Sequence, residues 1–473
     1  MENKISFYNT ISKKIELFVP HEEGKVKMYT CGPTVYHFAH IGNLRSYIME
    51  DTLEKFLLFS GYHVKRAMNI TDVGHIAKDA DSGEDKMIAG AKREHKTVMQ
   101  IAEFYTKSFF ADCDRLNIKK PEIIVPATTC IDEYIRLIEI LINKDSAYLS
   151  GGNVYFDTSK INDYYTLTGH TADELAIAVR NEVEEDSNKK NKTDFVLWFT
   201  QSKFADQELR WDSPWGIGYP GWHIECSAIS LKYLGEYLDI HCGGIDNIFP
   251  HHTNEIAQSE AILGHNWCKY WFHVQHLITN NGKMSKSSGE FLTLSHLQNK
   301  GYDPLVYRLF CLQSHYRNPL IFSYETLDNT AAAYAKLKER VAKLDCSGEL
   351  NKNAFNEYHE KLVEVIGNDL NTSMGITMLY DVLKDKEIND TTKLCVLRDF
   401  DRVFSLNIDA LYDCCKEKDL DMESYVIAKI EERLKAKNNK DYLIADAIRN
   451  ELLEKGVELK DTKDGTTWSM VKV

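Results

Sequence analysis

The sequence lacks the long apolar segments of a membrane protein. No run approaches the ~18–20 apolar residues needed to span a bilayer, and its first ten residues, MENKISFYNT, lack the apolar stretch of a signal peptide. Hydrophobic residues nevertheless make up 43% of the chain and aromatic residues 11%, as in a well-packed globular protein. We therefore expect a soluble, cytoplasmic protein with no membrane partner.

The cysteines lack the spacing of a local metal or redox motif. Eleven cysteines are scattered along the chain, and none belongs to a Cys-x-x-Cys pair. In a long chain without a secretion signal, such cysteines are more often free thiols, with one or two functional exceptions, than a disulfide framework. The sequence therefore predicts no disulfides.

Positive charge is also scarce. The chain has 57 Lys and Arg against 71 Asp and Glu, a net charge of −14, which argues against a general nucleic-acid coat because phosphate binding depends on cations. Residues 424–473 differ, with ten basic and nine acidic side chains and hence a net charge of +1. If the protein contacts RNA, this C-terminal segment is where we expect the contact.

The periodicity of apolar residues predicts an α/β fold. A chain of 473 residues is too long for one core, so we expect roughly two to four domains. Residues 26–29 and 63–68 resemble buried strands and flank a helical pattern over Ile41–Phe59, which predicts the start of a doubly wound sheet. Further expected elements are helices over 84–116, 130–144 and 250–263, strands over 154–156, 237–241 and 271–277, and a mostly helical segment after residue 323.

The junction between the first strand and the first helix carries His40-Ile41-Gly42-Asn43. A helix N-terminus offers unpaired N–H groups and the positive end of a dipole, which suit a polyphosphate. Gly42 permits close approach of the backbone, and His40 can donate to a phosphate oxygen. The alternative is that His40 is only a cap or a surface residue.

A second motif, Lys283-Met-Ser-Lys286-Ser287, follows the polar turn Asn280-Asn-Gly282. Two lysines on a loop can close over a triphosphate and neutralise the charge that develops on a leaving pyrophosphate. The alternative is a solvated basic loop.

A metal site is a third possibility. His251 and Glu255 are four residues apart on an expected helix and so share one face. Together with Cys31 and Cys226 they form a reasonable ligand set for zinc. The two cysteines are nearly 200 residues apart in the sequence, so buried free thiols and a solvated helix face remain the alternatives at this point.

Taken together, these motifs resemble the class I aminoacyl-tRNA synthetases, whose signatures are His-Ile-Gly-His and Lys-Met-Ser-Lys-Ser. The second signature matches in full, and the first departs at Asn43. Longer segments resemble the cysteinyl branch of that family: Cys31-Gly-Pro-Thr-Val-Tyr36, Trp222-His-Ile-Glu-Cys226 and Pro250-His-His-Thr-Asn-Glu255.

The resemblance implies a class I Rossmann-like, doubly wound catalytic domain with an insertion, followed by a mostly helical C-terminal half. It also implies the domain boundaries. We expect the two catalytic halves at 1–122 and 211–277, a connective insertion at 123–210, a signature-loop and stem-contact region at 278–322, a helical bundle at 323–415 and an anticodon-binding domain at 416–473.

The resemblance also implies the chemistry. The enzyme would activate L-cysteine with ATP and Mg2+, load it onto tRNA(Cys), and hold one zinc ion (Zn2+) with Cys31, Cys226, His251 and Glu255. Because an apolar pocket separates isosteres by only about 10- to 200-fold, a metal that prefers thiolate would distinguish cysteine from serine at binding. Four protein ligands fill a tetrahedron, so we expect Glu255 to be the weakly held one. We expect a monomer.

The remaining roles follow from the same resemblance. Catalysis is assigned to His40, Asn43, Lys283 and Lys286. ATP binding is assigned to these four residues with Gly42, Asp246 and Ser287, cysteine binding to Gly32, Thr71 and Trp222, and anticodon contact to Lys437, Tyr442, Asp446 and Asp461.

Two departures and two rival functions stay open. Cys242 occupies a position where many relatives have Gly, and residues 73–86 form a subgroup insertion or a surface loop. A ligase that joins cysteine to a sugar amine would use the same core, but such relatives lack the C-terminal module that residues 433–468 resemble. A non-catalytic RNA-binding paralogue would be expected to have degraded signatures.

Overall fold

The computed structural model describes residues 5–73, 97–169, 186–201, 209–279, 282–283, 292–439, 441–462 and 465–470. The chain forms two compact units. Unit 1 comprises Met1–Ala335 and Cys346–Leu406, and unit 2 comprises Lys336–Asp345 and Asn407–Val473. No described helix is long and apolar enough to cross a membrane. The nine cysteines described in the structure are free thiols.

A five-stranded parallel sheet forms the centre of unit 1, with the strand order β11-β10-β3-β4-β5. The chain builds β3, β4 and β5 in one direction and then returns to add β10 and β11 on the other side of β3. The strand order therefore reverses between β3 and β10, and ligands of doubly wound folds bind at this switch point. The strands are β3 (Lys25–Thr30), β4 (His63–Ile70), β5 (Ile123–Pro126), β10 (Leu238–Gly244) and β11 (Cys268–Val274).

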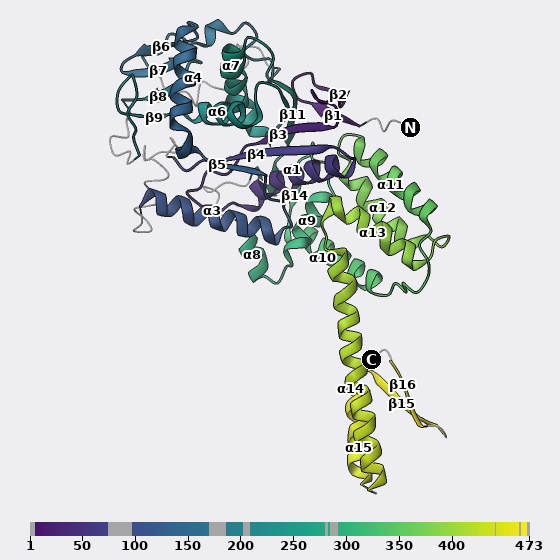
Figure 1. The fold of residues 1–473 in the computed structure, drawn as a ribbon. Coiled ribbons are helices and arrows are strands. Elements are labelled where there is room, and N and C mark those ends of the chain that lie inside the picture. The colour runs from purple at the N-terminus through teal and green to yellow at the C-terminus, as the bar shows by residue number, and fades with distance from the viewer. Residues whose placement is uncertain are drawn as a thin grey trace. The chain divides into compact units, whose positions relative to one another are not determined.

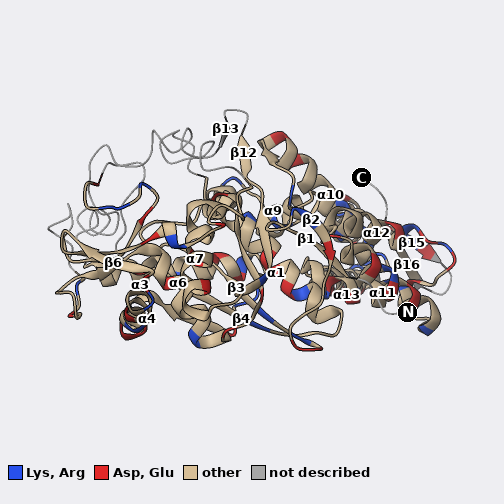
Figure 2. Cartoon of the chain, turned by 90° about the horizontal axis from the view of Figure 1, so that it is seen from above, with Lys and Arg blue, Asp and Glu red and all other residues tan. Residues whose placement is uncertain are grey.

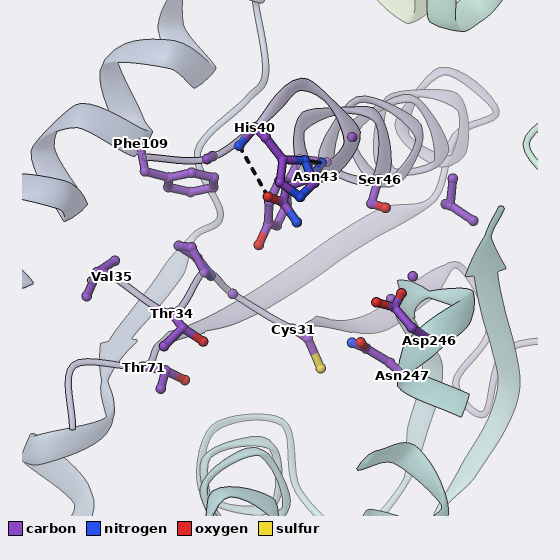
Figure 3. A pocket seen from close by; sticks show the side chains of 18 of the residues that line it. Cys31, Thr34, Val35, His40, Asn43, Ser46, Thr71, Phe109, Asp246 and Asn247 are labelled. Carbon is purple, nitrogen blue, oxygen red and sulfur yellow. Dashed lines mark hydrogen bonds between the residues drawn. The ribbon is translucent and has the colours of Figure 1, made fainter. Parts of the chain in front are cut away.

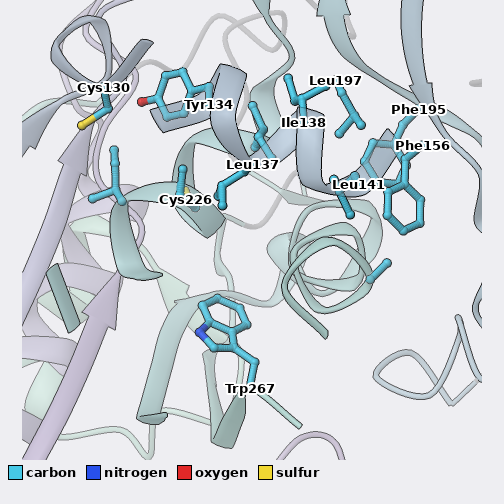
Figure 4. Packing of buried hydrophobic residues seen from close by; sticks show 14 of the residues in the cluster. Cys130, Tyr134, Leu137, Ile138, Leu141, Phe156, Phe195, Leu197, Cys226 and Trp267 are labelled. Carbon is cyan, nitrogen blue, oxygen red and sulfur yellow. The ribbon is translucent and has the colours of Figure 1, made fainter. Parts of the chain in front are cut away.

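Helices cover both faces of this sheet (Figure 1). α1 and α3 lie on one face, and α4, α6 and α7 lie on the other. The second face carries the main apolar core, in which Tyr134, Leu137 and Leu141 of α4 pack near Trp267 and Cys226 (Figure 4). The helices are α1 (Ile41–Phe59), α3 (Val98–Arg115), α4 (Ile131–Asn143), α6 (Trp222–Leu234) and α7 (Thr253–Leu263).

The insertion after α4 forms a separate four-stranded antiparallel sheet in the order β6-β7-β8-β9. Its strands are β6 (Ala147–Ser150), β7 (Asn153–Phe156), β8 (Phe195–Phe199) and β9 (Tyr219–Pro220). Short hairpins and turns complete this part of unit 1: β1 (Ser6–Asn9), β2 (Lys14–Leu17), η1 (Ala127–Cys130), η2 (Thr158–Lys160), η3 (Ile245–Asn247) and η4 (Ile248–His252).

Most predicted elements of the sheet are confirmed, and one is wrong in extent. The helix predicted over Ile41–Phe59 matches α1 at both ends. The strand predicted over 271–277 is instead divided, because β11 ends at Val274 and β12 begins at Leu277. At this break the backbone changes partner, because Gln275 N donates to Tyr316 O and His276 O accepts from Leu320 N, and the buried guanidinium of Arg45 donates to the carbonyls of Gln275 and His276 at 2.8 and 2.6 Å.

The helical segment after the sheet contributes to both units. Unit 1 contains β12 (Leu277–Thr279), β13 (Gly282–Lys283), β14 (Leu320–Phe322), α8 (Leu294–Asn299), α9 (Pro304–Leu312), α11 (Lys352–Gly367), α12 (Thr372–Lys384) and α13 (Asp390–Phe404), and α10 (Tyr324–Ala342) begins there. Arg308 of α9 is fully buried and pairs with Asp51 of α1 at 2.7 Å. This ion pair connects the helical segment to α1.

Unit 2 has a small core of its own. It contains α14 (Ile408–Asn438), α15 (Tyr442–Glu454) and the hairpin of β15 (Val457–Thr462) and β16 (Gly465–Met470). Val426, Ile448, Leu452, Val457 and Leu459 are buried together. The finer domain boundaries expected from the sequence stay predictions.

Candidate active site and metal site

A pocket lies at the switch point of the parallel sheet, where the carboxyl ends of β3 and β10 meet the N-terminus of α1 (Figure 3). Its volume is about 320 Å3, at the lower end of the size range of small-molecule sites. Ten of the predicted site residues line it: Cys31, Gly32, His40, Gly42, Asn43, Thr71, Trp222, Cys226, Asp246 and His251. The fold thus gathers residues that are more than 200 positions apart.

His40 and Asn43 form a reciprocal cap at the N-terminus of α1. The backbone N–H of Asn43 donates to His40 Nδ1 at 3.0 Å, and Asn43 Oδ1 accepts from the His40 backbone N–H at 3.2 Å. This arrangement is a capping box, which satisfies two backbone donors at once. Because Nδ1 accepts, a neutral His40 ring carries its proton on Nε2 and can donate there. Gly42 is needed beside this ring, since a Cβ would lie 2.9 Å from His40 Cε1.

The four predicted metal ligands lie close together, and all of them except Glu255 line the pocket. The Sγ atoms of Cys31 and Cys226 are 4.0 Å apart, and Cys226 Sγ lies 3.5 Å from His251 Nε2. Glu255 Oε1 lies 3.1 Å from His251 Nε2 and 4.0 Å from Cys31 Sγ. Ligands bound tetrahedrally to zinc are separated by about 3.3–3.8 Å. The donor atoms therefore lie close to the corners of a zinc tetrahedron, and the predicted sharing of a face by His251 and Glu255 is confirmed.

A second set of donors overlaps the first. Cys31, Glu255, His241 and His252 also lie within 4.8 Å of one another. His252 Nε2 is 3.4 Å from Cys31 Sγ, and His241 Nε2 is 2.8 Å from Glu255 Oε2. His241 and His252 do not line the pocket, whereas Cys226 and His251 do. The first set therefore fits a metal that meets a substrate, and the second supplies partners that orient its ligands.

The pKa values of Cys226 and His251 show that a positive charge stabilises this group of thiols and carboxylate. The hydrogen bond with Cys31 lowers the pKa of Cys226 to about 7 against the effect of burial, with help from His251. Burial lowers the pKa of His251, but the negative charges of Glu255 and Cys226 outweigh it and raise the pKa to about 9. A thiolate and an imidazolium are thus favoured, and a metal cation supplies the same charge compensation.

The predicted cysteine-binding residues surround this cluster. Gly32 N donates to Asn69 Oδ1 at 2.8 Å, and a Cβ on Gly32 would lie 1.6 Å from the Asn69 carbonyl oxygen. Thr71 donates to the buried Glu225 at 3.2 Å and accepts from Asn69 Nδ2 at 3.0 Å. The Trp222 ring lies 4.9 Å from that of His251 and is 41% exposed. Sequence reasoning missed Asn69 and Glu225, although Glu225 lies within the motif Trp222–Cys226 and Asn69 is two residues before the predicted Thr71.

The predicted ATP-binding residues are only partly described. Asp246 lies in η3, directly after β10, and lines the pocket with Gly243 and Gly244. The backbone of Lys283 pairs with Ile278 in the hairpin of β12 and β13. Lys286 and Ser287 lie outside the described residues, as do residues 74–86 of the segment 73–86, so its interpretation as a subgroup insertion or a surface loop stays open.

The predicted anticodon residues all belong to unit 2. Asp461 is engaged within the protein, since Arg433 donates to both of its oxygens at 2.8 and 3.0 Å and Lys437 donates at 2.8 Å. Tyr442 is 62% exposed at the start of α15, and Asp446 is exposed one turn later. Tyr442 and Asp446 are therefore the more accessible of the four side chains.

Comparison with known proteins defines the class. A family model described as "tRNA synthetases class I (C) catalytic domain" matches residues 17–332. The fold agrees, because a Mycobacterium tuberculosis methionyl-tRNA synthetase in complex with methionyl-adenylate superposes with a TM-score of 0.55 at 14% identity, covering 82% of this chain and 93% of that one. Unit 1 therefore contains the catalytic domain of a class I tRNA synthetase.

Sequence relatives narrow the class further. The Cysteine--tRNA ligase of Treponema denticola is 44% identical over 98% of this chain and 99% of its own length. That of Borreliella burgdorferi is 42% identical over 98% of each chain. The chain belongs to the cysteine--tRNA ligase family.

Proposed function

We propose that the protein activates L-cysteine with ATP and Mg2+ and transfers the cysteinyl group to tRNA(Cys) in the cytoplasm, with a zinc ion recognising the thiol. The observation that carries this proposal is that a cluster of metal-ligand side chains and a phosphate-binding helix N-terminus lie at the same pocket. The thiol, imidazole and carboxylate donors of Cys31, Cys226, His251 and Glu255 lie within 4.8 Å of one another. The capped helix N-terminus at His40 and Asn43 lines the same pocket.

Activation needs no protein nucleophile. The substrate carboxylate attacks the α-phosphate, and the protein supplies orientation and charge stabilisation. His40 Nε2 and the Gly42 backbone N–H at the N-terminus of α1 donate to the phosphates, since the N–H groups of Ile41 and Asn43 are bonded to Leu292 O and His40. We assign Lys283, Lys286 and Ser287 to the leaving pyrophosphate. Asp246 accepts from the ribose, while Gly42 permits close approach of the nucleotide. The terminal ribose of the tRNA then attacks the cysteinyl-adenylate.

Discrimination against serine follows from the donor set. When bound, a zinc ion would stabilise the thiolate of the substrate far better than a neutral hydroxyl. Gly32, Thr71 and Trp222 would enclose the amino acid beside the ligand cluster. Glu255 is the ligand that we expect to yield its place to the substrate, since His241 holds its other oxygen at 2.8 Å and would keep the carboxylate oriented.

Cys226→Ser tests this proposal. The variant should lose bound zinc, and its KM for cysteine in ATP–pyrophosphate exchange should rise by about 100-fold or more, since second-shell changes alone cost 10- to 100-fold in metal affinity. Elemental analysis and exchange kinetics measure the two effects. Cys130→Ser is the matched control, because Cys130 is buried in the same core and lies outside both donor sets.

The outcomes also separate the rival functions. Unchanged cysteine affinity in a metal-free preparation would refute recognition of the thiol by zinc. No cysteine-dependent exchange in the parent protein would refute both enzyme functions and favour the non-catalytic paralogue. Exchange without charging of tRNA would favour the ligase that uses a sugar amine.

A further inference from the structure

Arg45 is a buried cation that the proposed chemistry does not use. It lies on α1 two residues after Asn43, and its side chain is 0% exposed. Among the described residues, its guanidinium donates to four main-chain carbonyls and to no carboxylate. Burial lowers the pKa of Arg45, and a buried cation without a counter-ion costs stability. This cost indicates that the contacts of Arg45 have a function beyond holding the fold together.

The four carbonyls belong to two separate segments of backbone. One guanidinium nitrogen donates to the carbonyls of Gln275 and His276 at 2.8 and 2.6 Å. The other donates to those of Asn318 and His315 at 2.7 and 3.4 Å. A guanidinium presents five N–H donors in one rigid plane, whereas an ammonium presents three donors at a single point. Arg is therefore the side chain that can join both segments from one position on α1.

The first segment is a wall of the catalytic pocket. Residues 274–277, which we call the pocket wall, line the pocket where β11 gives way to β12. Val274 pairs with Gly244 in the parallel sheet, and Asp246, which we assign to the ribose, follows two residues later. The pocket wall therefore runs beside the proposed nucleoside contacts. Arg45 does not line the pocket itself, so it acts on this region only through the wall.

The second segment is anchored from the side away from α1. Residues 315–318 form what we call the backbone support. Asp369, in the loop between α11 and α12, is 2% exposed and accepts from Tyr316 Oη and from Arg317 Nε, each at 2.6 Å. These two bonds fix the support to the helical segment of unit 1. Arg45 thus connects the pocket wall to a part of the backbone that is itself held in place.

We propose that Arg45 positions the pocket wall for ATP binding by fixing the carbonyls of Gln275 and His276 on the backbone support. This inference rests on the proposed function. It assigns Arg45 as a positioning residue for the nucleotide, distinct from the residues that bind cysteine and the phosphates.

The test measures ATP–pyrophosphate exchange without tRNA for the full chain and for Arg45→Lys. The variant keeps the positive charge but cannot hold both segments at once. Its KM for ATP should rise by about tenfold, since misplacement of a binding group by about 1 Å can cost up to 100-fold. The KM for cysteine should stay within about twofold of the parent. General loss of folded protein would lower the apparent kcat without separating the two KM values.

Arg308→Lys is the matched control. Arg308 is also fully buried and contacts α1, where it pairs with Asp51 at 2.7 Å, and it donates to the Leu116 carbonyl at 2.9 Å. Neither of these partners lines the pocket. The control should lower the thermal midpoint about as much as Arg45→Lys does and leave both KM values within about twofold of the parent.

Asp369→Asn tests the support without a change on α1. The amide N–H2 group cannot accept from Arg317, whose side chain is 37% exposed, so water can replace the lost bond. The protein should therefore remain folded while the support loosens. The KM for ATP should rise by about threefold, as expected for one weakened hydrogen bond, and the KM for cysteine should not change.

Several outcomes would overturn the proposal. One is a parental KM for ATP in Arg45→Lys, and another is an equal rise in the KM for ATP and for cysteine. An equal rise in Arg308→Lys would reduce Arg45 to general support of the fold. If Arg45→Lys yields no folded protein, Asp369→Asn decides, and an unchanged KM for ATP there overturns the proposal. Absence of exchange in the parent protein would instead refute the proposed function itself.

Discussion

Glu50 is a single residue whose burial makes the stability of unit 1 depend on pH. It lies on α1, lines the pocket and is 1% exposed, and its Oε2 has no hydrogen-bond partner among the described residues. Burial raises the pKa of Glu50 from 4.5 to about 8, although Arg66 lowers it. The folded protein therefore keeps a proton between pH 4.5 and 8 that the unfolded chain releases. The free energy of unfolding must fall as pH rises through this window.

Glu50→Gln should remove this dependence while preserving the shape of the side chain. Relative to the parent, the variant should gain stability between pH 6 and 8, by ~1 kcal/mol or more, since the limiting slope is about 1.4 kcal/mol per pH unit. Thermal unfolding at pH 6, 7 and 8 measures the difference. Glu139→Gln on the exposed side of α4 is the control, and parallel curves for parent and Glu50→Gln would contradict the assignment.

The ligand residues show what the sequence can and cannot predict at this scale. The pairing of His251 with Glu255 follows from helical periodicity, because the fourth residue along a helix shares its face. The meeting of Cys31 with Cys226 does not follow from spacing, because β3 and α6 come together only through the sheet. His241 and His252 were not predicted for the same reason: their contact with the cluster depends on how β10 and η4 are placed.

At the scale of the element, the N-terminus of α1 combines a structural and a chemical role. Asn43 accepts the His40 backbone N–H through Oδ1, so it stabilises the helix start in the place where the family signature has His. Its amide N–H2 remains the group that can donate to a phosphate. One side chain therefore serves both purposes through different atoms.

Substitutions of Asn43 should separate these purposes. Asn43→Asp keeps the capping acceptor and should leave the thermal midpoint near that of the parent. The added negative charge beside the phosphates should slow ATP–pyrophosphate exchange by about 100-fold, as expected for loss of one charge-stabilising donor. Asn43→Ala should lower both exchange and stability, the latter by ~1 kcal/mol. If Asn43→Asp destabilised the protein as much as Asn43→Ala, the capping role would be wrong.

Regular elements were predicted well where local pattern determines them. α1, β3 and β4 were found within two residues, because two short apolar strands bound the helical segment on either side, although α1 itself is buried on nearly all its faces. The break between β11 and β12 was missed, since it depends on contacts with residues 316–320 and with a guanidinium that comes from α1. The π-helical turn Ile248–His252 ahead of α7 likewise replaced the continuous helix expected from Pro250.

At the scale of the whole molecule, the two units have separate cores. Among the described residues, the apolar cluster of unit 2 consists of buried side chains from residues 426–459 with Tyr425, Ile430 and Trp468 packed against them, and it has no member from the parallel sheet. The distribution of charge does not indicate where a nucleic acid would bind unit 1, because basic and acidic side chains are interspersed over its helices (Figure 2). The sequence predicted a separate C-terminal module from family resemblance, and composition alone gave only a weak indication of it.

Because the two units have separate cores, we expect that a variant can lose the transfer of cysteine to tRNA(Cys) and still form the cysteinyl-adenylate. Leu452→Ala removes a fully buried side chain from the core of unit 2, and such a change costs about 2–5 kcal/mol. That is enough to unfold a core of this size at 37 °C, while the pocket in unit 1 keeps all its contacts. Charging of tRNA(Cys) should therefore fall by more than tenfold, with ATP–pyrophosphate exchange within about twofold of the parent.

Leu397→Ala is the matched change in unit 1, because Leu397 is also fully buried and belongs to α13, which packs on α1. It should lower exchange and charging together, since it loosens the helix that presents His40 and Asn43. If Leu452→Ala reduced exchange as much as charging, the units would unfold as one. The C-terminal unit would then be a structural support for the pocket, and the assignment of Tyr442 and its neighbours to the anticodon would lose its basis.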